Sequence, residues 1–405
     1  MRILLFLASL VIFHSLAHAE IEWSGYGSIV AGKVIGGEVD PSGEKEFQVD
    51  LYDYAFYTEE FNFKPESMFA LQARYDWGNN LTITGQLVAK GADNFRPELD
   101  WLYLTYNFSD DAYLMAGRRN LPMYYFSEYM EIGYAYPWIR PPANLYWWEI
   151  TQFNGLTVAK SFNVGNWTLV LGAFAGSEER EDIEAHDFWR ERGFYYFPDE
   201  SAPDVSNYVK GSADVTWSDI RGINVNASNG WIDLRASYFE THYETWGEYL
   251  VDPDRLPVRS TANAVTEFDL QFIGLSGSFD LNLATVVFDY NLVLYDDGYG
   301  FEFPTYLVIA IYNHATWQPY VGMSNAAGKL TKDYFGFGTG DAEEHRMYTL
   351  GLRYNFHPSA SLKIQYDDFN DNGLRGTGLG STASDYDFSY HNDAQLFSVS
   401  VDFVF

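Results

Sequence analysis

The sequence predicts an all-β fold in which antiparallel strands, each with one apolar and one polar face, close into a barrel. The carboxyl-terminal stretch Ala394 to Phe405 shows the pattern most clearly, because Phe and Val alternate there with Ser and Asp. About sixteen such stretches follow one another along the chain, separated by short turns and long polar loops. A last strand ending on Phe405 would leave an exposed apolar edge in an open sheet. Pairing of the last strand with the first removes that edge.

The strands are expected where apolar residues recur with a period of two. Turn signals such as Gly78-Asn79-Asn80 and Ser228-Asn229-Gly230 lie between them. The expected strands are Ile21 to Lys33, Phe69 to Asp76, Leu81 to Lys90, Glu98 to Phe108, Ala112 to Arg118, Leu156 to Phe162, Trp167 to Ala175, Val215 to Ala227, Trp231 to Phe239, Val265 to Phe279, Leu283 to Tyr295, Thr305 to Tyr312, Trp317 to Ser324, Met347 to Phe356, Ser361 to Tyr366 and Ala394 to Phe405. The aromatic segment Tyr52 to Phe63 either extends neighbouring strands or forms an excursion of its own.

The amino terminus has the features of a cleaved secretory signal. Arg2 supplies a positive start, Ile3 to Phe13 a short apolar run, and Ala17-His18-Ala19 a small-residue cleavage pattern. Residues 1–19 are therefore expected to be removed, which leaves residues 20–405 as one barrel. No later segment contains the roughly 20 consecutive apolar residues of a membrane helix. The mean hydropathy of −0.23 is too polar for a helical bundle in lipid.

Composition excludes several classes of function. The net charge is −31, which disfavours nucleic acid as a partner. The chain contains no Cys, so disulfides, thiol catalysis and thiolate metal sites are excluded together. Aromatic residues make up 19% of the chain, and the interfacial girdles of a membrane barrel would use them. The acidic surface either holds divalent cations between lipopolysaccharide groups or keeps the loops solvated.

One interruption in the strand pattern separates the fifth strand from the sixth. Between about residues 120 and 150 the periodicity stops, and Pro122, Pro137, Pro141 and Pro142 make a continuous ladder implausible. The apolar strand that ends at Phe405 resembles the carboxyl-terminal signature of bacterial outer-membrane β-barrel proteins. In that family the barrel assembly machinery reads this signature.

The resemblance extends over the whole mature chain to the general diffusion porins. The runs Gly117 to Pro122 and Ile132 to Pro142 are similar to motifs of gammaproteobacterial porins. The resemblance implies an outer-membrane homotrimer, in contact with lipid and lipopolysaccharide, whose third long loop, residues 120–150, folds into the barrel. It implies passage of small hydrophilic solutes without a cofactor.

Charged residues could form the narrowest part of such a pore. Glu128, Glu131 and Glu149 lie in the third loop. Arg74, Lys90 and Arg118 occupy neighbouring strands on the polar face, and Arg119 and Arg140 are further candidates. Carboxylates facing guanidinium groups would set up a transverse field in confined water. The alternative is that these charges are solvated separately.

The same loop is dense in aromatic residues. Tyr134, Tyr136 and Trp138 could stack against sugar rings, or they could pack against the barrel wall, which is the interpretation favoured here. The acidic run Glu178 to Asp187 is expected in the fourth long loop, facing outward, where it would favour cations at the pore mouth.

No motif indicates catalysis or a metal site. The six His residues of the mature chain are scattered singly, and neither HExxH nor G-x-S-x-G occurs. The first hypothesis is therefore a passive, cation-leaning porin. The second is a substrate-specific channel for sugars or small carboxylates, using the loop aromatics and Arg140. The third is a barrel enzyme or adhesin with a plugged lumen.

Overall fold

A computed structural model describes residues 21–38, 45–50, 55–146, 150–184, 209–251, 264–295, 300–332, 339–371 and 393–405. The predicted signal peptide, residues 1–19, and Glu149 lie outside the described residues. Among the described residues, no helix is long and apolar enough to cross a membrane.

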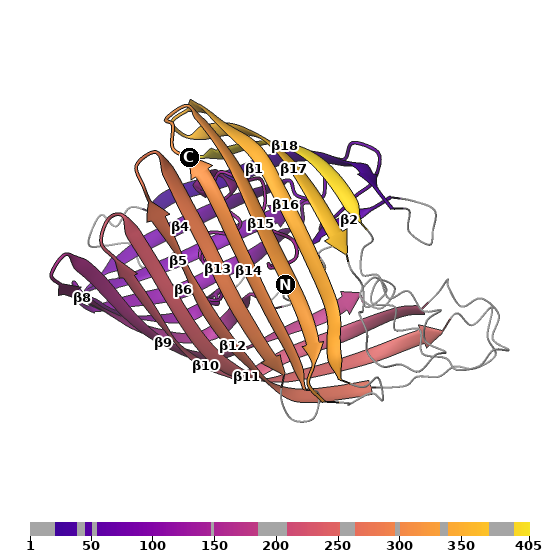
Figure 1. The fold of residues 1–405 in the computed structure, drawn as a ribbon. Coiled ribbons are helices and arrows are strands. Elements are labelled where there is room, and N and C mark those ends of the chain that lie inside the picture. Colours follow the sequence, from indigo (N-terminus) through magenta and orange to yellow (C-terminus); the bar gives the residue numbers. More distant parts are fainter. Residues whose placement is uncertain are drawn as a thin grey trace, which may run out of the picture.

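The chain forms one closed antiparallel barrel (Figure 1). Its sixteen strands are β1 (Ile21–Gly37), β4 (Met68–Gly78), β5 (Leu81–Lys90), β6 (Pro97–Ser109), β7 (Ala112–Asn120), β8 (Gln152–Val164), β9 (Trp167–Glu184), β10 (Val209–Ser228), β11 (Ile232–Val251), β12 (Ala264–Asp280), β13 (Ala284–Tyr295), β14 (Phe301–Tyr312), β15 (Trp317–Leu330), β16 (Gly340–His357), β17 (Ala360–Asp371) and β18 (Ala394–Val404). The predicted barrel of about sixteen strands is confirmed.

The barrel closes where the last strand meets the first. Tyr26 pairs with Val404, and Gly25 and Phe405 exchange two backbone hydrogen bonds of 3.0 Å. Glycine in β1 makes room for the terminal aromatic rings: a Cβ on Gly27 would lie 2.5 Å from the Phe403 ring. The terminal Phe strand therefore completes the ladder, as its alternation predicted, and no strand edge remains.

The outer face of the strands is apolar, and the inner face is polar on strands such as β17 but apolar on strands such as β14. In β17, Lys363, Gln365 and Asp367 are buried, whereas Ile364 between them is 42% exposed. Large apolar side chains are exposed on the outer face all around the barrel, including Leu71, Leu87, Leu104, Leu156, Ile223, Leu275, Val308, Val321, Leu350 and Ile364. This arrangement suits a wall that has lipid on one side and polar groups on the other.

Exposed aromatic residues mark the end of the barrel that carries the short turns. They are Trp77, Phe108, Trp231, Trp317, Phe356 and Phe405. At this end Asn79 and Asn80 both have positive φ, 53° and 66°, which is the backbone of the tight hairpin turn that the sequence predicted. A girdle of exposed aromatic residues is typical of the membrane interface of an outer-membrane barrel.

The loop between β1 and β4 contains a small separate hairpin. Its strands are β2 (Phe47–Asp50) and β3 (Ala55–Tyr57). Phe47 and Tyr57 are buried, and Phe47 packs against Phe369 of β17 with ring centres 5.3 Å apart. Of the two possibilities that the sequence left open, this aromatic segment therefore forms its own excursion, held against the barrel wall.

Several strands extend beyond their predicted ends, and β9 is the case that changes a prediction about function. The strand β9 continues to Glu184, and Glu179 pairs with Thr216 of β10. Glu178 is 7% exposed, so its placement on an outward-facing loop was wrong. The reason is that β10 is also long and continues the backbone ladder beyond the apolar band, where the residues of β9 are mostly charged and its alternation disappears. Asp187, at the end of the acidic run, lies outside the described residues.

Candidate functional site

The segment between β7 and β8, the β7–β8 loop (residues 121–151), is largely buried. It contains one short 3-10 helix, η1 (Gly133–Ala135). Leu121, Met123 and Tyr124 pack in a cluster with Phe239 and Phe272 of the wall. A second cluster joins loop and wall residues: Tyr125, Phe126, Tyr136, Trp138, Leu145, Val287, Leu307, Ile309, Ile311 and Tyr320. The loop therefore packs on the inner faces of β8 to β15, most of which lie far from it along the chain.

Polar side chains of the same wall satisfy the backbone of the loop. Asp289 of β13 accepts hydrogen bonds of 3.0 Å from the Tyr125 amide and the Tyr146 hydroxyl. Gln365 of β17 accepts one of 2.7 Å from the amide of Ile139. These amide and hydroxyl groups lose their contacts with water when the loop is buried. Each hydrogen bond to the wall compensates for that loss.

Arg140 joins the loop to two other parts of the chain. Its Nε and Nη2 lie 2.5 and 2.6 Å from the carboxylate of Glu66 in the β1–β4 loop. Its Nη1 lies 2.5 Å from Asp367 Oδ2 of β17, and Nη2 donates to Ser398 of β18. Burial opposes the charge of this 6% exposed side chain, but Glu66 and Asp367 outweigh that cost and raise the pKa of Arg140. The guanidinium is therefore charged at any pH of interest.

A buried lysine holds the neighbouring part of the loop. Lys363 of β17 is 0% exposed, and its Nζ lies 3.0 Å from Asp402 Oδ2. The same Nζ donates to the carbonyl oxygens of Gly133 and Trp138 at 2.5 and 2.7 Å. Arg140, Lys363 and their partners on β17, β18 and the β1–β4 loop are called the clamped side of the loop.

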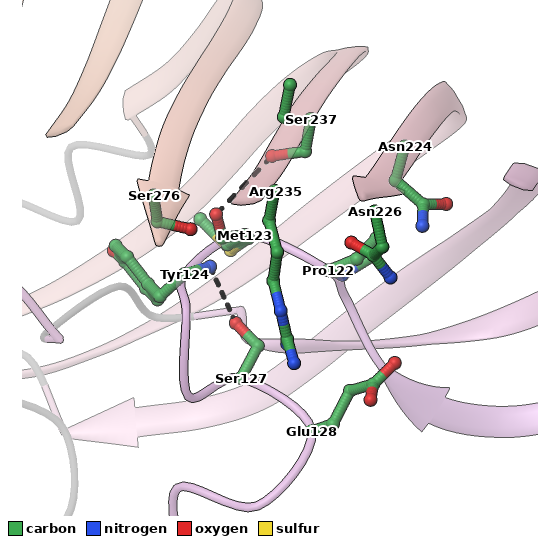
Figure 2. Close-up of a pocket in the computed structure, with 11 residues that line it drawn as sticks. Pro122, Met123, Tyr124, Ser127, Glu128, Asn224, Asn226, Arg235, Ser237 and Ser276 are labelled. Atoms are coloured by element: carbon green, nitrogen blue, oxygen red, sulfur yellow. Dashed lines mark hydrogen bonds between the residues drawn. The ribbon is translucent and has the colours of Figure 1, made fainter. Parts of the chain in front are cut away.

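The opposite flank of the loop borders two small adjacent cavities that open to solvent. Four residues line both cavities: Pro122, Glu128, Asn224 and Asn226. One cavity also contains Arg235 of β11, and the other contains Arg119 of β7. This region is called the cavity side. Figure 2 shows Arg235 extending from β11 toward Ser127 and Glu128 of the loop.

Opposite charges face each other at the cavity side. Glu128 Oε1 lies 3.6 Å from Arg119 Nη2, and half of the Glu128 side chain is exposed. Arg235 lies with Cζ 4.7 Å from the centre of the Tyr125 ring and donates to the Tyr125 carbonyl at 2.9 Å. Its Nε lies 3.3 Å from Asp233. The charges therefore come from the loop on one side and from β7 and β11 on the other.

Among the other predicted charges that the structure describes, Glu131 of the loop and Lys90 of the wall meet. Lys90 Nζ lies 2.8 Å from Glu131 Oε1, and the Tyr26 hydroxyl lies 3.4 Å from Glu131 Oε2. Arg74 pairs instead with Glu22 at 3.2 Å near the short-turn end of the barrel. Alternation along β4 places Arg74 on the polar face, as predicted. Arg74 nevertheless lies at a different height along the barrel axis from the β7–β8 loop, so the two do not meet.

Arg118 also has different partners from those expected. Its Nη1 lies 2.5 Å from Glu178 Oε1 of β9, and its Nη2 donates to Gln152 at 2.8 Å. Gly117 directly before it has φ +138°, a conformation that favours glycine, and it pairs across the ladder with Gly155. Arg118 therefore bonds to side chains of β8 and β9 and not to the carboxylates of the loop.

The three residues predicted to stack against sugars, Tyr134, Tyr136 and Trp138, differ from one another in exposure. Trp138 is 0% exposed and Tyr136 is 4% exposed, so their ring faces are covered, as the packing interpretation expects. Tyr134 is partly exposed, but its ring lies under Arg353, with Cζ 4.7 Å from the ring centre. Its hydroxyl donates to the carbonyl of Pro358. In this conformation none of the three offers an open ring face to a sugar.

Sequence analysis missed Arg235, Asn224 and Asn226. A signal for all three exists, because Asn224 and Asn226 alternate with Ile223 and Val225, and Asp233, Arg235 and Ser237 alternate with apolar residues in β11. These residues lie about a hundred positions from the loop along the chain, so nothing in the sequence indicated that they contact it. Among the described residues, no group of three or more acidic or His side chains is arranged to hold a metal ion.

No protein-family model and no curated protein sequence matches the chain. Solved structures do match in fold. An in-vitro folded OmpT, an outer membrane protein of Vibrio cholerae in a trimer form, superposes with a TM-score of 0.55 at 12% identity, covering 96% of this chain and 100% of that one. This chain has the fold of outer-membrane β-barrels.

Two porin structures give similar values. An anion-selective porin from Comamonas acidovorans matches with a TM-score of 0.52 at 12% identity, over 96% of this chain and 100% of that one. The Salmonella typhi OmpF complex with daunomycin matches with a TM-score of 0.54 at 12% identity, over 96% and 98%. At this identity the likeness concerns the fold alone.

Proposed function

We propose that this chain is an outer-membrane porin, a channel through which small hydrophilic solutes and ions diffuse passively. The observation that carries the proposal is the cavity side, where Glu128 of the loop faces Arg119 and Arg235 of the wall. Polar groups line this route, and the outer surface of the barrel is apolar. Opposed charges in confined water order the solvent and disfavour apolar solutes.

In this proposal the β7–β8 loop is the constriction, folded into the lumen. Its contacts support the assignment, because they reach β11, β13, β17 and the β1–β4 loop. Since such contacts extend over much of the wall, the passage is narrow and the conductance is expected to be small for a barrel of sixteen strands. The narrow passage also favours the second hypothesis, a substrate-specific channel, over a wide general pore.

The remaining parts of the proposal follow from composition and resemblance. A cleaved signal exports the chain, the Phe405 strand engages the barrel assembly machinery, and three copies assemble in the outer membrane. The net charge of −31 raises the local concentration of cations and gives the channel a cation preference. The chain is proposed to be a channel and not an enzyme.

Single-channel recording in a planar bilayer under a salt gradient tests this function. The proposal expects steady current steps and a reversal potential on the cation-selective side. A Glu128→Gln/Glu131→Gln double variant is expected to lower the cation preference, because it removes both loop carboxylates near the wall. Absence of any conductance from correctly folded protein would refute the channel and favour the barrel enzyme or adhesin.

A further inference from the structure

Asp289 of β13 binds two separate segments of the β7–β8 loop to one point of the barrel wall. Its side chain is 1% exposed. Its Oδ2 accepts hydrogen bonds of 3.0 Å from the Tyr125 amide, near the start of the loop, and from the Tyr146 hydroxyl, near its end. Its Oδ1 accepts one of 3.1 Å from Asn291 Nδ2. Because a buried donor without an acceptor is costly, both loop segments depend on this carboxylate.

Tyr125 is held by three neighbouring strands. Besides the bond from its amide to Asp289 of β13, its carbonyl oxygen accepts a hydrogen bond of 2.9 Å from Arg235 of β11. Its hydroxyl donates to Ser278 of β12 at 2.9 Å. The Arg235 guanidinium also lies over the Tyr125 ring, with Cζ 4.7 Å from the ring centre. Main-chain and side-chain groups of Tyr125 are therefore fixed relative to β11, β12 and β13.

The turn that follows Tyr125 carries Glu128. The Tyr124 amide donates to the Ser127 hydroxyl at 2.8 Å, which closes the turn (Figure 2). Asn120 of β7 donates from its side-chain amide to the Ser127 carbonyl oxygen at 2.7 Å. A short turn closed by its own hydrogen bonds moves as one unit, so the anchor at Tyr125 determines where the Glu128 main chain lies.

We propose that Asp289 is the positioning residue of the constriction: it sets the place of the Glu128 carboxylate and, through it, the cation preference of the channel. The contact of Glu128 with Arg119 is 3.6 Å long and half of the Glu128 side chain is exposed, so this pair is too loose to fix the carboxylate by itself. Asp289 is buried and lines neither of the two cavities. This inference rests on the proposed channel function and names a residue that controls its ion preference from within the wall.

Two substitutions at Asp289 distinguish its acceptor oxygens from its charge. Asp289→Asn keeps one carbonyl oxygen, which has two lone pairs and can accept from both Tyr125 and Tyr146. Its new amide can donate to Asn291 Oδ1 once that amide turns over, because this buried oxygen has no hydrogen-bond partner among the described residues. Asp289→Leu has a similar size but leaves both donors of the loop without an acceptor.

Reversal potentials under a salt gradient test the proposal. Asp289→Leu is expected to lose as much cation preference as Glu128→Gln does, because the Glu128 carboxylate leaves its place, whereas Asp289→Asn is expected to keep the wild-type value. The double variant Asp289→Leu/Glu128→Gln should equal Glu128→Gln alone, because both changes act through one carboxylate. Equal losses in Asp289→Asn and Asp289→Leu would mean that Asp289 acts by its own charge. That result, or an unchanged value in Asp289→Leu, would overturn the inference.

A milder variant and a matched control accompany these measurements. Tyr146→Phe removes one donor to Asp289 and keeps the ring, whose centre is 4.2 Å from that of Tyr124. It is expected to shift the reversal potential in the same direction by a smaller amount, since the Tyr125 amide keeps its bond. Thr305→Val removes a buried wall hydroxyl that has no hydrogen-bond partner among the described residues, and it should cause no shift. A shift equal to that of Asp289→Leu would contradict a specific role of Asp289.

Spin labelling separates this inference from the channel function. The chain has no Cys, so a nitroxide attached to Glu128→Cys reports on this turn alone. Its spectrum is expected to show a restrained label in the wild-type and Asp289→Asn backgrounds and a more mobile label with Asp289→Leu. That change without any channel current would refute the porin and support the positioning role. Current with unchanged label mobility and unchanged selectivity would support the porin and refute the positioning role.

Discussion

The β7–β8 loop meets the barrel wall in two ways. On the clamped side, Arg140 and Lys363 are buried. Arg140 contacts two carboxylates at 2.5 Å, and Lys363 contacts one carboxylate and two carbonyl oxygens at 2.5 to 3.0 Å. On the cavity side, Glu128 is half exposed and 3.6 Å from Arg119. The same residue types therefore serve different purposes: buried, closely bonded pairs fix the position of the loop, and the more exposed, loosely bonded pair remains accessible to solutes.

We expect the largest loss of stability from a substitution on the clamped side. Arg140→Met leaves the carboxylates of Glu66 and Asp367 without their counter-charge. We expect it to lower the free energy of unfolding by about 3 to 5 kcal/mol, the range for breaking one partner of a buried pair. Urea titration followed by tryptophan fluorescence measures this, and the current should become noisy as the loop moves. The control is the triple variant that adds Glu66→Gln and Asp367→Asn, which should recover most of the loss.

We expect a somewhat smaller loss of stability from a substitution in the apolar contact between the loop and the wall. Leu145 is 0% exposed and belongs to the cluster around Trp138. Leu145→Ala should cost about 2 to 5 kcal/mol through lost transfer energy and the cavity left behind. The same urea titration measures it. A cost below about 0.5 kcal/mol, as for a typical surface change, would mean that the loop does not depend on this packing.

On the cavity side, a substitution should change function more than stability. Glu128→Gln removes a half-exposed pair and should cost at most about 1 kcal/mol. The reversal potential under a salt gradient is nevertheless expected to move toward lower cation preference, because a negative charge at the cavity side is lost. A large stability loss with unchanged selectivity would invert the comparison between the two sides.

The smallest effect is expected at Arg74. Its pair with Glu22 is exposed on both sides and near the short-turn end. Arg74→Gln should change stability by less than about 1 kcal/mol and should leave the reversal potential unchanged. A clear shift in selectivity would show that the constriction lies nearer this end than the cavities do.

The sequence by itself determined the barrel. Alternation with a period of two specifies which face of each strand is apolar, turn residues specify where strands reverse, and both signals are local. Sixteen strands, the hairpin turns and the closing role of the Phe405 strand followed from these signals. The limits of the β7–β8 loop followed too, because proline removes ladder donors wherever it occurs.

Only the tertiary structure decided which charges meet. Parity assigned Arg74 and Arg118 to the inner face but could not say which carboxylate either would meet, and it is Arg119 that reaches Glu128. Arg140 finds Asp367 more than two hundred residues away, and Arg235 reaches Tyr125 from β11. Such pairings depend on strand register and on the path of the loop through space, which no local pattern of residues encodes.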